Sequence, residues 1–431
     1  MREILNINKG WKFSKDVSSV PSKLPDDWQD VDLPYTWNGD DGQDGGNDYY
    51  RGKGYFAKIL TKDKMPQGEE IYIQLDGVNS TAEVYFNGKK LCEHNGGYSA
   101  FRVKLDDIKD ENLLVVTADN SPNDYVYPQV ADFTFYGGIY REVKLIGVSK
   151  NHFDLDFFGS TSFAVTPVIS GNDAKITLDA YCNGEVEFEI DDGNEVVAKA
   201  KVSGKNPSAV LEIKDVHLWD GVDDPFLYNA SAKLIVDGQV ADEVKSRFGC
   251  RTFEIDAQKG FILNGRPYPL RGVSRHQDRP HIGNALLPEH HKEDMDLICE
   301  MGANTIRLAH YQHAQYFYDL CDERGIIVWA EIPYISKHLE KGVENTISQM
   351  KELIFQNYNH PSIVVWGLSN EISMGGATPA IVQNHKMLND LVHSIDKTRL
   401  TTEAVLTACN INEEYVHISD VLSYNHYFGW Y

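Results

Sequence analysis

Cysteine, long apolar segments and positive charge are all scarce in this chain of 431 residues. The 6 cysteines are scattered and include no Cys-x-x-Cys pair, which argues against zinc-ribbon and redox patterns and favours free, buried thiols. No apolar run approaches the roughly 20 residues of a membrane-spanning helix. The N-terminus also lacks the apolar core of a signal peptide, so the chain as given predicts a cytoplasmic protein that does not enter a membrane.

The shortage of positive charge argues against polyanionic partners. Lysine and arginine total 41 against 64 acidic residues, which gives a formal net charge of −23. Binding to phosphate groups depends on clustered basic side chains, so neither nucleic acid nor an anionic membrane surface is an expected partner. The charge does not identify a substrate.

Residues 1–147 have the pattern of an all-β domain. Short alternating runs, such as residues 70–75 and 82–86, are separated by turn signals. Asn87-Gly88 between two such runs is a strong hairpin marker, because both residues tolerate the positive φ of a type I′ turn. Residues 148–253 continue the β pattern over about the length of an immunoglobulin-like sandwich and contain no chemical motif. Two β-sandwiches are therefore predicted.

From about residue 254 apolar runs alternate with amphipathic helical segments, which predicts a parallel sheet covered by helices. A complete TIM barrel has eight strands and typically about 250 residues, so the residues after 254 predict an incomplete barrel. The expected strands are residues 270–274, 304–309, 326–332, 363–368, 400–405 and 421–424, and the expected helices are 289–301, 314–324, 343–357 and 381–395.

Polar side chains follow each of these apolar runs. The carboxyl ends of barrel strands converge on one face, where the active sites of such barrels lie. Any one of these side chains alone is more simply a structural hydrogen-bonding group, but packing does not select the whole series. In strand order they are Arg275, His276 and Asp278; Arg307, His310 and Tyr311; Glu331; Asn370 and Glu371; Glu403; and Asn425, His426 and Tyr427.

The strand that ends on Asn370-Glu371 indicates glycoside hydrolysis. That reaction uses two carboxyl groups, and the surrounding His, Asn, Tyr and Trp suit a sugar pocket. Glu371, held against Trp366, would have the raised pKa of an acid catalyst. Asn370 would bind the sugar hydroxyl next to the reacting carbon. The alternative for Glu371 is a structural salt bridge at the strand end.

Other chemistries find less support. No histidine pair forms a recognised ligand pattern with a carboxylate, so no metal site is predicted and no cofactor is required. A loosely held Mg²⁺ or Na⁺ ion near Glu331 stays open. No Gly-x-Ser-x-Gly motif surrounds Ser369, which argues against a serine hydrolase.

Several motifs, in this order along the chain, resemble glycoside hydrolase family 2, the β-galactosidase, β-glucuronidase and β-mannosidase group. The resemblance implies a jelly-roll sugar-binding domain (1–147), an immunoglobulin-like β-sandwich (148–253) and the N-terminal part of a TIM-barrel catalytic domain (254–431), with retaining hydrolysis of a terminal β-glycoside. The motifs are Asp132-Phe133, residues 137–141 (GGIYR), 261–265 (FILNG), 271–278 (RGVSRHQD), 304–311 (NTIRLAHY), 366–371 (WGLSNE) and 424–431 (YNHYFGWY).

The resemblance assigns roles to individual residues. It implies that Glu371 is the acid/base and that Asn370 binds the 2-hydroxyl. Arg275 and Glu331 are expected in the same pocket from their places at strand ends. The remaining implied residues are His276, His310 and Asp132 in contact with the sugar, and Tyr427 and Tyr431 close to the nucleophile.

The family's nucleophile, a glutamate on the seventh barrel strand, has no match in this chain. The last matching motif ends at Tyr431, and Glu403 on the fifth strand does not fit the role. The expectation is therefore the N-terminal part of a longer enzyme, with little turnover by itself. Unpaired barrel edges also predict a homo-oligomer.

The predicted substrate is a terminal β-D-galactoside. Gln277-Asp278 and residues 330–333 (AEIP) resemble the β-galactosidase branch most. A β-glucuronidase stays open, because the basic motif that this branch uses for the C6 carboxylate has no counterpart in the chain. A catalytically incomplete sugar-binding protein is the alternative from another functional class.

Overall fold

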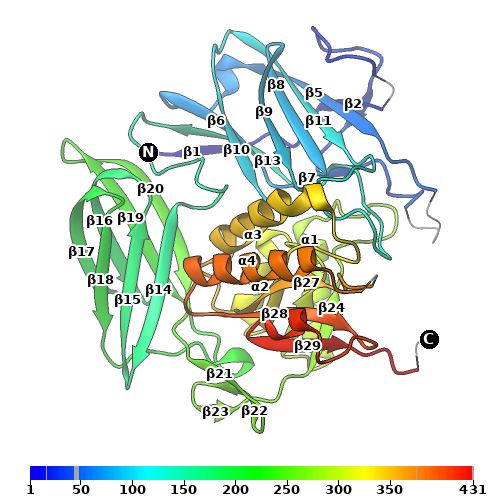
Figure 1. The fold of residues 1–431 in the computed structure, drawn as a ribbon. Coiled ribbons are helices and arrows are strands. Elements are labelled where there is room, and N and C mark those ends of the chain that lie inside the picture. Colours follow the sequence, from blue (N-terminus) through cyan, green and yellow to red (C-terminus); the bar gives the residue numbers. More distant parts are fainter. Residues whose placement is uncertain (16, 43–47, 375, 430–431) are drawn as a thin grey trace.

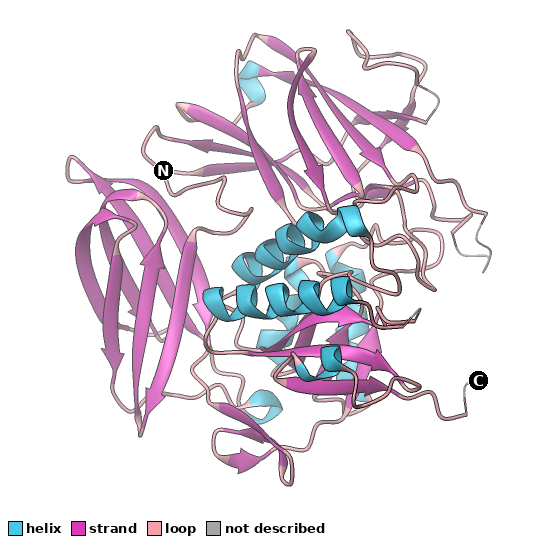
Figure 2. Cartoon of the chain, in the orientation of Figure 1, coloured by secondary structure: helices cyan, strands magenta, loops and turns pink. Residues whose placement is uncertain are grey.

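The computed structural model describes residues 1–15, 17–42, 48–374 and 376–429. Two β-rich regions lie against a third region that carries all four α-helices found among these residues (Figures 1 and 2). The three regions follow one another along the chain, as the sequence pattern predicts.

The first region packs two antiparallel sheets around a core that contains Trp11, Phe56 and Val84. The predicted hairpin is confirmed, because Asn87 and Gly88 both have positive φ between β8 and β9. One sheet is β1 (Glu3–Asn6), β13 (Val143–Val148), β6 (Glu70–Leu75) and β10 (Phe101–Leu105). The other is β3 (Gln29–Val31), β2 (Trp11–Ser14), β5 (Lys53–Thr61), β11 (Glu111–Asp119), β8 (Thr81–Phe86) and β9 (Lys89–Asn95), and a small sheet has β4 (Tyr35–Thr36), β12 (Gly138–Ile139) and β7 (Val78–Asn79).

The second region is a smaller sandwich with Phe188 and Leu234 in its core. Its strands alternate buried and exposed residues, as expected for sheets with one face in water. One sheet is β14 (Phe163–Ser170), β15 (Asp173–Ala180) and β18 (Ser208–Ile213), and the other is β17 (Val196–Lys205), β16 (Asn183–Asp191), β19 (Tyr228–Val236) and β20 (Gln239–Phe248). A short sheet of β21 (Phe253–Asp256), β22 (Gly260–Leu263) and β23 (Arg266–Pro267) leads into the third region.

The third region is a curled parallel sheet with helices on its outer side (Figure 1). Each strand pairs with the next along the chain, and β24 and β29 form the two edges of the described sheet, as in an incomplete barrel. The strands are β24 (Gly272–Arg275), β25 (Thr305–Leu308), β26 (Ile327–Glu331), β27 (Ile363–Asn370), β28 (Leu400–Leu406) and β29 (Val421–Asn425). The helices are α1 (Pro288–Glu300), α2 (Gln315–Arg324), α3 (Val343–Asn357) and α4 (Pro379–Ile395).

Buried hydrogen bonds fix the first sandwich to the barrel. Asn345 on α3 accepts the backbone N–H of Tyr127 at 2.9 Å, and the Tyr127 hydroxyl accepts the N–H of Leu339 at 2.6 Å. Arg141 donates from Nη2 to the carbonyl of Gln312 at 2.7 Å. Because buried polar groups are costly to leave unpaired, these contacts hold the loops of the sandwich in place over the strand ends.

Candidate active site

An arginine and a glutamate form the centre of the polar face at the strand ends. Arg307 on β25 donates from Nε and Nη2 to the two carboxylate oxygens of Glu331 on β26, each at 3.0 Å. Glu331 is completely buried. Two parallel N–H···O bonds of this kind are strong and fix the plane of both groups. The guanidinium also lies 4.4 Å from the ring centre of Trp329.

The same guanidinium reaches two further strand ends, those of β27 and β29. Its Nη2 donates to Asn370 Oδ1 at 2.7 Å, and its Nη1 donates to Asn425 Oδ1 at 3.1 Å. His310 Nδ1 lies 2.6 Å from Glu331 Oε1. We call Arg307, His310, Glu331, Asn370 and Asn425 the central cluster.

The negative charge of Glu331 is stabilised by Arg307 and His310 in the central cluster. Burial by itself would raise the pKa of this carboxyl, but Arg307 and His310 outweigh burial and lower the pKa of Glu331 below its ordinary value. Glu331 is therefore ionised and holds Arg307 in place. A loosely held Mg²⁺ or Na⁺ ion near Glu331 stays an open prediction. Both carboxylate oxygens are bonded to Arg307, and Oε1 also contacts His310.

The cluster sets the orientation of the Asn370 amide. Its Oδ1 accepts hydrogen bonds from Arg307 and from Asn425 Nδ2, the latter at 3.0 Å. Both neighbours are donors, so the amide is held with its oxygen toward them. Within the described part of the chain, Nδ2 of Asn370 has no hydrogen-bond partner, which leaves an N–H₂ donor for a ligand hydroxyl.

Glu371 follows directly after β27, where the backbone takes a positive φ of 49° and its N–H donates to the carbonyl of Ala404 at 2.8 Å. Glu371 Oε1 accepts from Asn425 Nδ2 at 2.8 Å and from the Tyr427 hydroxyl at 2.5 Å. No described residue bonds to Oε2. One carboxyl oxygen is thus fixed by the protein, and the other is open to a ligand.

The first sandwich contributes an aromatic wall. The Phe133 ring lies 5.0 Å from that of His276 and 6.0 Å from that of His310, and the two imidazole rings are 5.2 Å apart. Burial, with His310 nearby, lowers the pKa of His276 to about 4, so His276 is neutral near pH 7. The exposed Asp132 opposes this shift through its charge, which places it in the electrostatic surroundings of His276.

The structure does not bring every predicted residue into this group. Arg275 is buried on the side of β24 that faces the helices, where its Nε and Nη2 donate to Asp294 and its Nη1 lies 3.0 Å from His313. Tyr431 lies outside the described residues. The expectation that Trp366 packs against Glu371 is wrong: the Trp366 indole is fully buried and donates to Asp396 at 2.9 Å.

Glu403 also lies apart from the central cluster. Its buried side chain faces α4, with Oε2 at 3.4 Å from His385 Nε2, and both carboxyl oxygens lack a hydrogen-bond partner among the described residues. Burial raises the pKa of Glu403 to about 8 and lowers the pKa of His385 to about 4. Both groups are therefore neutral near pH 7, and His385 Nε2 accepts the Ser369 hydroxyl at 2.7 Å. Glu403 was predicted at a strand end, but it lies in the middle of β28, and its side chain faces α4.

Two contributors were not predicted in these roles. Phe133 was part of a quoted motif, yet nothing in a loop of a β domain indicated that its ring would meet His276 and His310. Asn425 stood in the strand-end series, but only the three-dimensional arrangement shows that it links Asn370 to Glu371.

Among the described residues, no helix has the length and apolar character needed to cross a bilayer.

Comparison with known families accounts for the three regions. Residues 42–149 match the sugar binding domain of glycosyl hydrolases family 2, residues 161–251 match a second family 2 domain, and residues 253–431 match the family's TIM barrel domain. The chain belongs to glycoside hydrolase family 2. The fold class expected from the motifs is thereby confirmed.

Individual relatives differ in the sugar that their names specify. A Bacteroides fragilis protein named β-glucuronidase is 40% identical over 99% of this chain and 64% of its own length. A Thermoanaerobacterium thermosulfurigenes protein named β-galactosidase is 32% identical over 93% of this chain and 58% of its own length. The solved structure of an FMN-binding β-glucuronidase from Facaelibacterium prausnitzii L2-6 superimposes with a TM-score of 0.95 at 41% identity, covering 100% of this chain and 68% of that one. The chain therefore spans about two thirds or less of these relatives.

The buried carboxyl of Glu403 leads to a prediction about pH and stability. With a folded pKa of about 8, Glu403 keeps a proton that the unfolded chain releases near its ordinary pKa of about 4.5. Stability is thus lost as pH rises through this window, by roughly 3–5 kcal/mol in all. Glu403→Gln is uncharged at every pH. The melting temperature of this variant, measured relative to that of the wild type, should therefore rise as the pH increases from about 5 to about 9.

Differential scanning calorimetry on both proteins measures this difference. Glu414→Gln, at an exposed position in the chain segment after β28, is the control and should follow the wild type at each pH. Parallel pH profiles for wild type and Glu403→Gln would show that Glu403 is not held in its neutral form.

Proposed function

We propose that this chain forms the substrate pocket of a retaining glycosidase that removes terminal β-D-glucuronic acid residues. The single observation that carries the choice of sugar is the higher identity to proteins named β-glucuronidase, 40% and 41%, than to the β-galactosidase at 32%. The β-D-galactoside expected from the motifs 277–278 and 330–333 becomes the second candidate, since these short motifs weigh less than identity over the whole chain.

Glu371 is the proposed acid/base. Asn425 and Tyr427 hold Oε1, and Oε2 is the oxygen that would protonate the leaving group and later deprotonate a water molecule. The fixed position of Oε1 supports this role, because an acid catalyst has to meet the glycosidic oxygen within hydrogen-bond distance.

Asn370 is the proposed partner of the 2-hydroxyl. Its amide is oriented by Arg307 and Asn425 so that Nδ2 is a donor at a fixed position. A hydrogen bond to this hydroxyl strengthens in the oxocarbenium-like transition state. His276, which is neutral, and His310 with Asp132 would contact the other hydroxyls from the aromatic side of the pocket.

We propose that the nucleophile is a carboxylate other than Glu331 and Glu403. Both oxygens of Glu331 are bonded to Arg307, and Glu403 faces α4. Neither is placed to attack a sugar that Glu371 protonates. Self-association and a cytoplasmic location stay predictions.

The choice between the two sugars can be tested by binding. Lactones derived from glucuronic acid and from galactose share the flat reacting carbon of the transition state and differ at C6. Isothermal titration calorimetry on the 431-residue chain should show the glucuronic acid type binding at least about tenfold more tightly, a difference of about 1.4 kcal/mol. Tighter binding of the galactose type would reverse the assignment, and equal binding would remove its support.

The catalytic roles can be tested with p-nitrophenyl β-D-glucuronide. Any turnover of the 431-residue chain is expected to survive Glu403→Gln and to fall by about 10²-fold or more in Glu371→Gln, because Glu371 is the proposed acid/base and Glu403 is not the proposed nucleophile. Turnover that Glu403→Gln abolishes while the fold is retained would overturn the proposal about the nucleophile. Substantial turnover that survives Glu371→Gln would contradict the role of Glu371 itself.

A further inference from the structure

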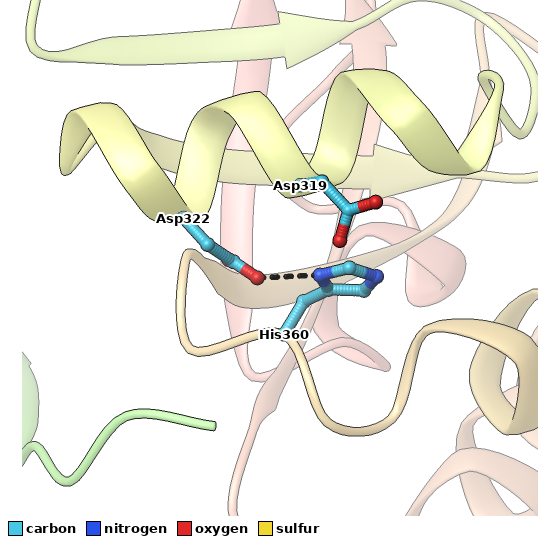
Figure 3. Close-up of side chains that lie close together, drawn as sticks. All are labelled: Asp319, Asp322 and His360. Atoms are coloured by element: carbon cyan, nitrogen blue, oxygen red, sulfur yellow. Dashed lines mark hydrogen bonds and ion pairs between the residues drawn. The ribbon is translucent and has the colours of Figure 1, made fainter. Parts of the chain in front are cut away.

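A second group of ionisable side chains lies at the opposite end of the barrel sheet. Asp319 and Asp322 are three residues apart on α2, and His360 lies in the turn before β27 (Figure 3). Glu371 follows the other end of β27, and eight residues of strand span roughly 25 Å. This group is therefore separate from the central cluster, and the proposed glycosidase chemistry does not use it.

The three side chains converge closely enough to share one ion. Asp322 Oδ2 lies 2.6 Å from His360 Nδ1, and one ligand atom from each of Asp319, Asp322 and His360 lies within 4.8 Å of the other two. Figure 3 shows both carboxylates beside the imidazole ring. The Asp322 side chain is almost completely buried and the His360 side chain is mostly buried, so little movement is open to them.

The surroundings fix which imidazole nitrogen faces the carboxylates. His360 Nε2 lies 3.4 Å from Gln315 Oε1, and Gln315 Nε2 donates to Asn357 Oδ1 at 3.0 Å, which orients the amide with its oxygen toward the ring. Nε2 therefore points its N–H at Gln315, and Nδ1 shares a proton with Asp322 Oδ2, which a bound ion would displace. A metal-binding histidine typically donates its other N–H in this way.

The second oxygen of Asp322 is also held, because the backbone N–H of Ser362 donates to Oδ1 at 3.2 Å. Ligand carboxylates in metal sites carry outer hydrogen bonds of this kind. The Ser362 hydroxyl is buried and has no hydrogen-bond partner among the described residues. The residue whose backbone holds Asp322 therefore also carries a hydroxyl that its described protein neighbours leave unsatisfied.

The group lies on the wall of a large cavity between the three regions. This cavity has a volume of about 940 Å³, and Gln315, Asp319, Asp322 and His360 all line it. A site with three protein ligands needs space for water at the remaining coordination position. The cavity provides that space.

We propose that Asp319, Asp322 and His360 bind one Zn²⁺ ion through two carboxylates and the imidazole Nδ1. Zinc–nitrogen and zinc–oxygen bonds are about 2.0–2.2 Å long, so the present 2.6 Å between Asp322 Oδ2 and His360 Nδ1 has to open to about 3 Å. The ion takes the place of the proton that these two atoms share. The imidazole ligand selects Zn²⁺ over Ca²⁺ and Mg²⁺, which prefer oxygen ligands only.

Arg247 of the second sandwich competes for one of the ligands. Its Nη2 lies 3.2 Å from Asp319 Oδ1, and its Nη1 pairs with Glu323 on the same helix. Asp319 has a second oxygen, which no described residue bonds. Binding through that oxygen would leave the contact to Arg247 in place, and the ion would then join α2, the turn before β27 and the second sandwich.

Titration of the chelator-treated 431-residue chain with Zn²⁺, followed by calorimetry, tests the proposal. We expect one equivalent with a Kd of about 10 µM or tighter, and at least about tenfold weaker binding for Asp319→Asn. Glu323→Gln is the matched control: it removes a carboxylate that Arg247 also pairs with, but no ligand, and should bind Zn²⁺ like the wild type. Asp319 is partly exposed, so its substitution should leave the fold intact, which circular dichroism checks.

Each other result overturns the proposal. Absence of stoichiometric Zn²⁺ binding would mean that Asp322 and His360 form only a hydrogen-bonded structural pair. Equal binding by Asp319→Asn and Glu323→Gln would place the ion elsewhere, and binding of Ca²⁺ in preference to Zn²⁺ would exclude the imidazole as a ligand. These readouts involve no glycoside, so they are independent of the proposed function.

Discussion

The paired hydrogen bonds between Arg307 and Glu331 are the interaction on which the rest of the site depends. A fully buried carboxylate is stable only when a positive charge and hydrogen bonds compensate for lost water, and Arg307 supplies both. Once its guanidinium is fixed by Glu331, its remaining N–H groups determine how Asn370 and Asn425 are turned. Asn425 in turn holds Glu371. The position of the proposed acid catalyst, Glu371, therefore depends, through Asn425, on the Arg307–Glu331 pair, which need not touch the substrate.

Two glutamates of the same sheet show how the direction of a side chain decides its chemistry. Glu331 faces the strand-end pocket beside Arg307 and has a lowered pKa, whereas Glu403 faces α4 without a cation and has a pKa of about 8. Both are completely buried. The difference comes from the partner alone, because burial by itself raises the pKa of any carboxyl. One residue is a permanent anion that organises a site, and the other is a neutral group in the core.

The first sandwich contributes side chains to the pocket that the barrel sheet does not supply. Phe133 reaches the two imidazoles from the first sandwich, and the buried contacts of Tyr127 and Arg141 hold that sandwich against the barrel. A loop that carries an aromatic ring to the proposed sugar site has to be positioned as firmly as the strand that carries the proposed acid. Hydrogen bonds between backbone and side chain across the interface provide that constraint.

Much of this arrangement could be predicted from the sequence, because strands, helices and strand ends follow local periodicity. The apolar run before Asn370 indicated both a buried strand and a polar residue at its end, and the Asn87-Gly88 turn followed from backbone preference alone. The direction in which each side chain points from its strand was harder to predict. Arg275, Trp366 and Glu403 all occur near strand ends or on strands of the barrel, yet each faces the helices, since alternation along a short strand is easily displaced by one residue. The contact of Phe133 with the imidazoles depends on how two domains pack, which no local pattern encodes.

A crystal structure of the chain with the lactone derived from glucuronic acid tests the central claim most directly. We expect Asn370 Nδ2 within hydrogen-bond distance of the hydroxyl next to the lactone carbonyl carbon, with Arg307 still bonded through two nitrogens to Glu331. A structure in which Arg307 leaves Glu331 to bind the ligand, or in which Asn370 turns its oxygen toward the sugar, would contradict the claim that this buried pair sets the geometry of the site.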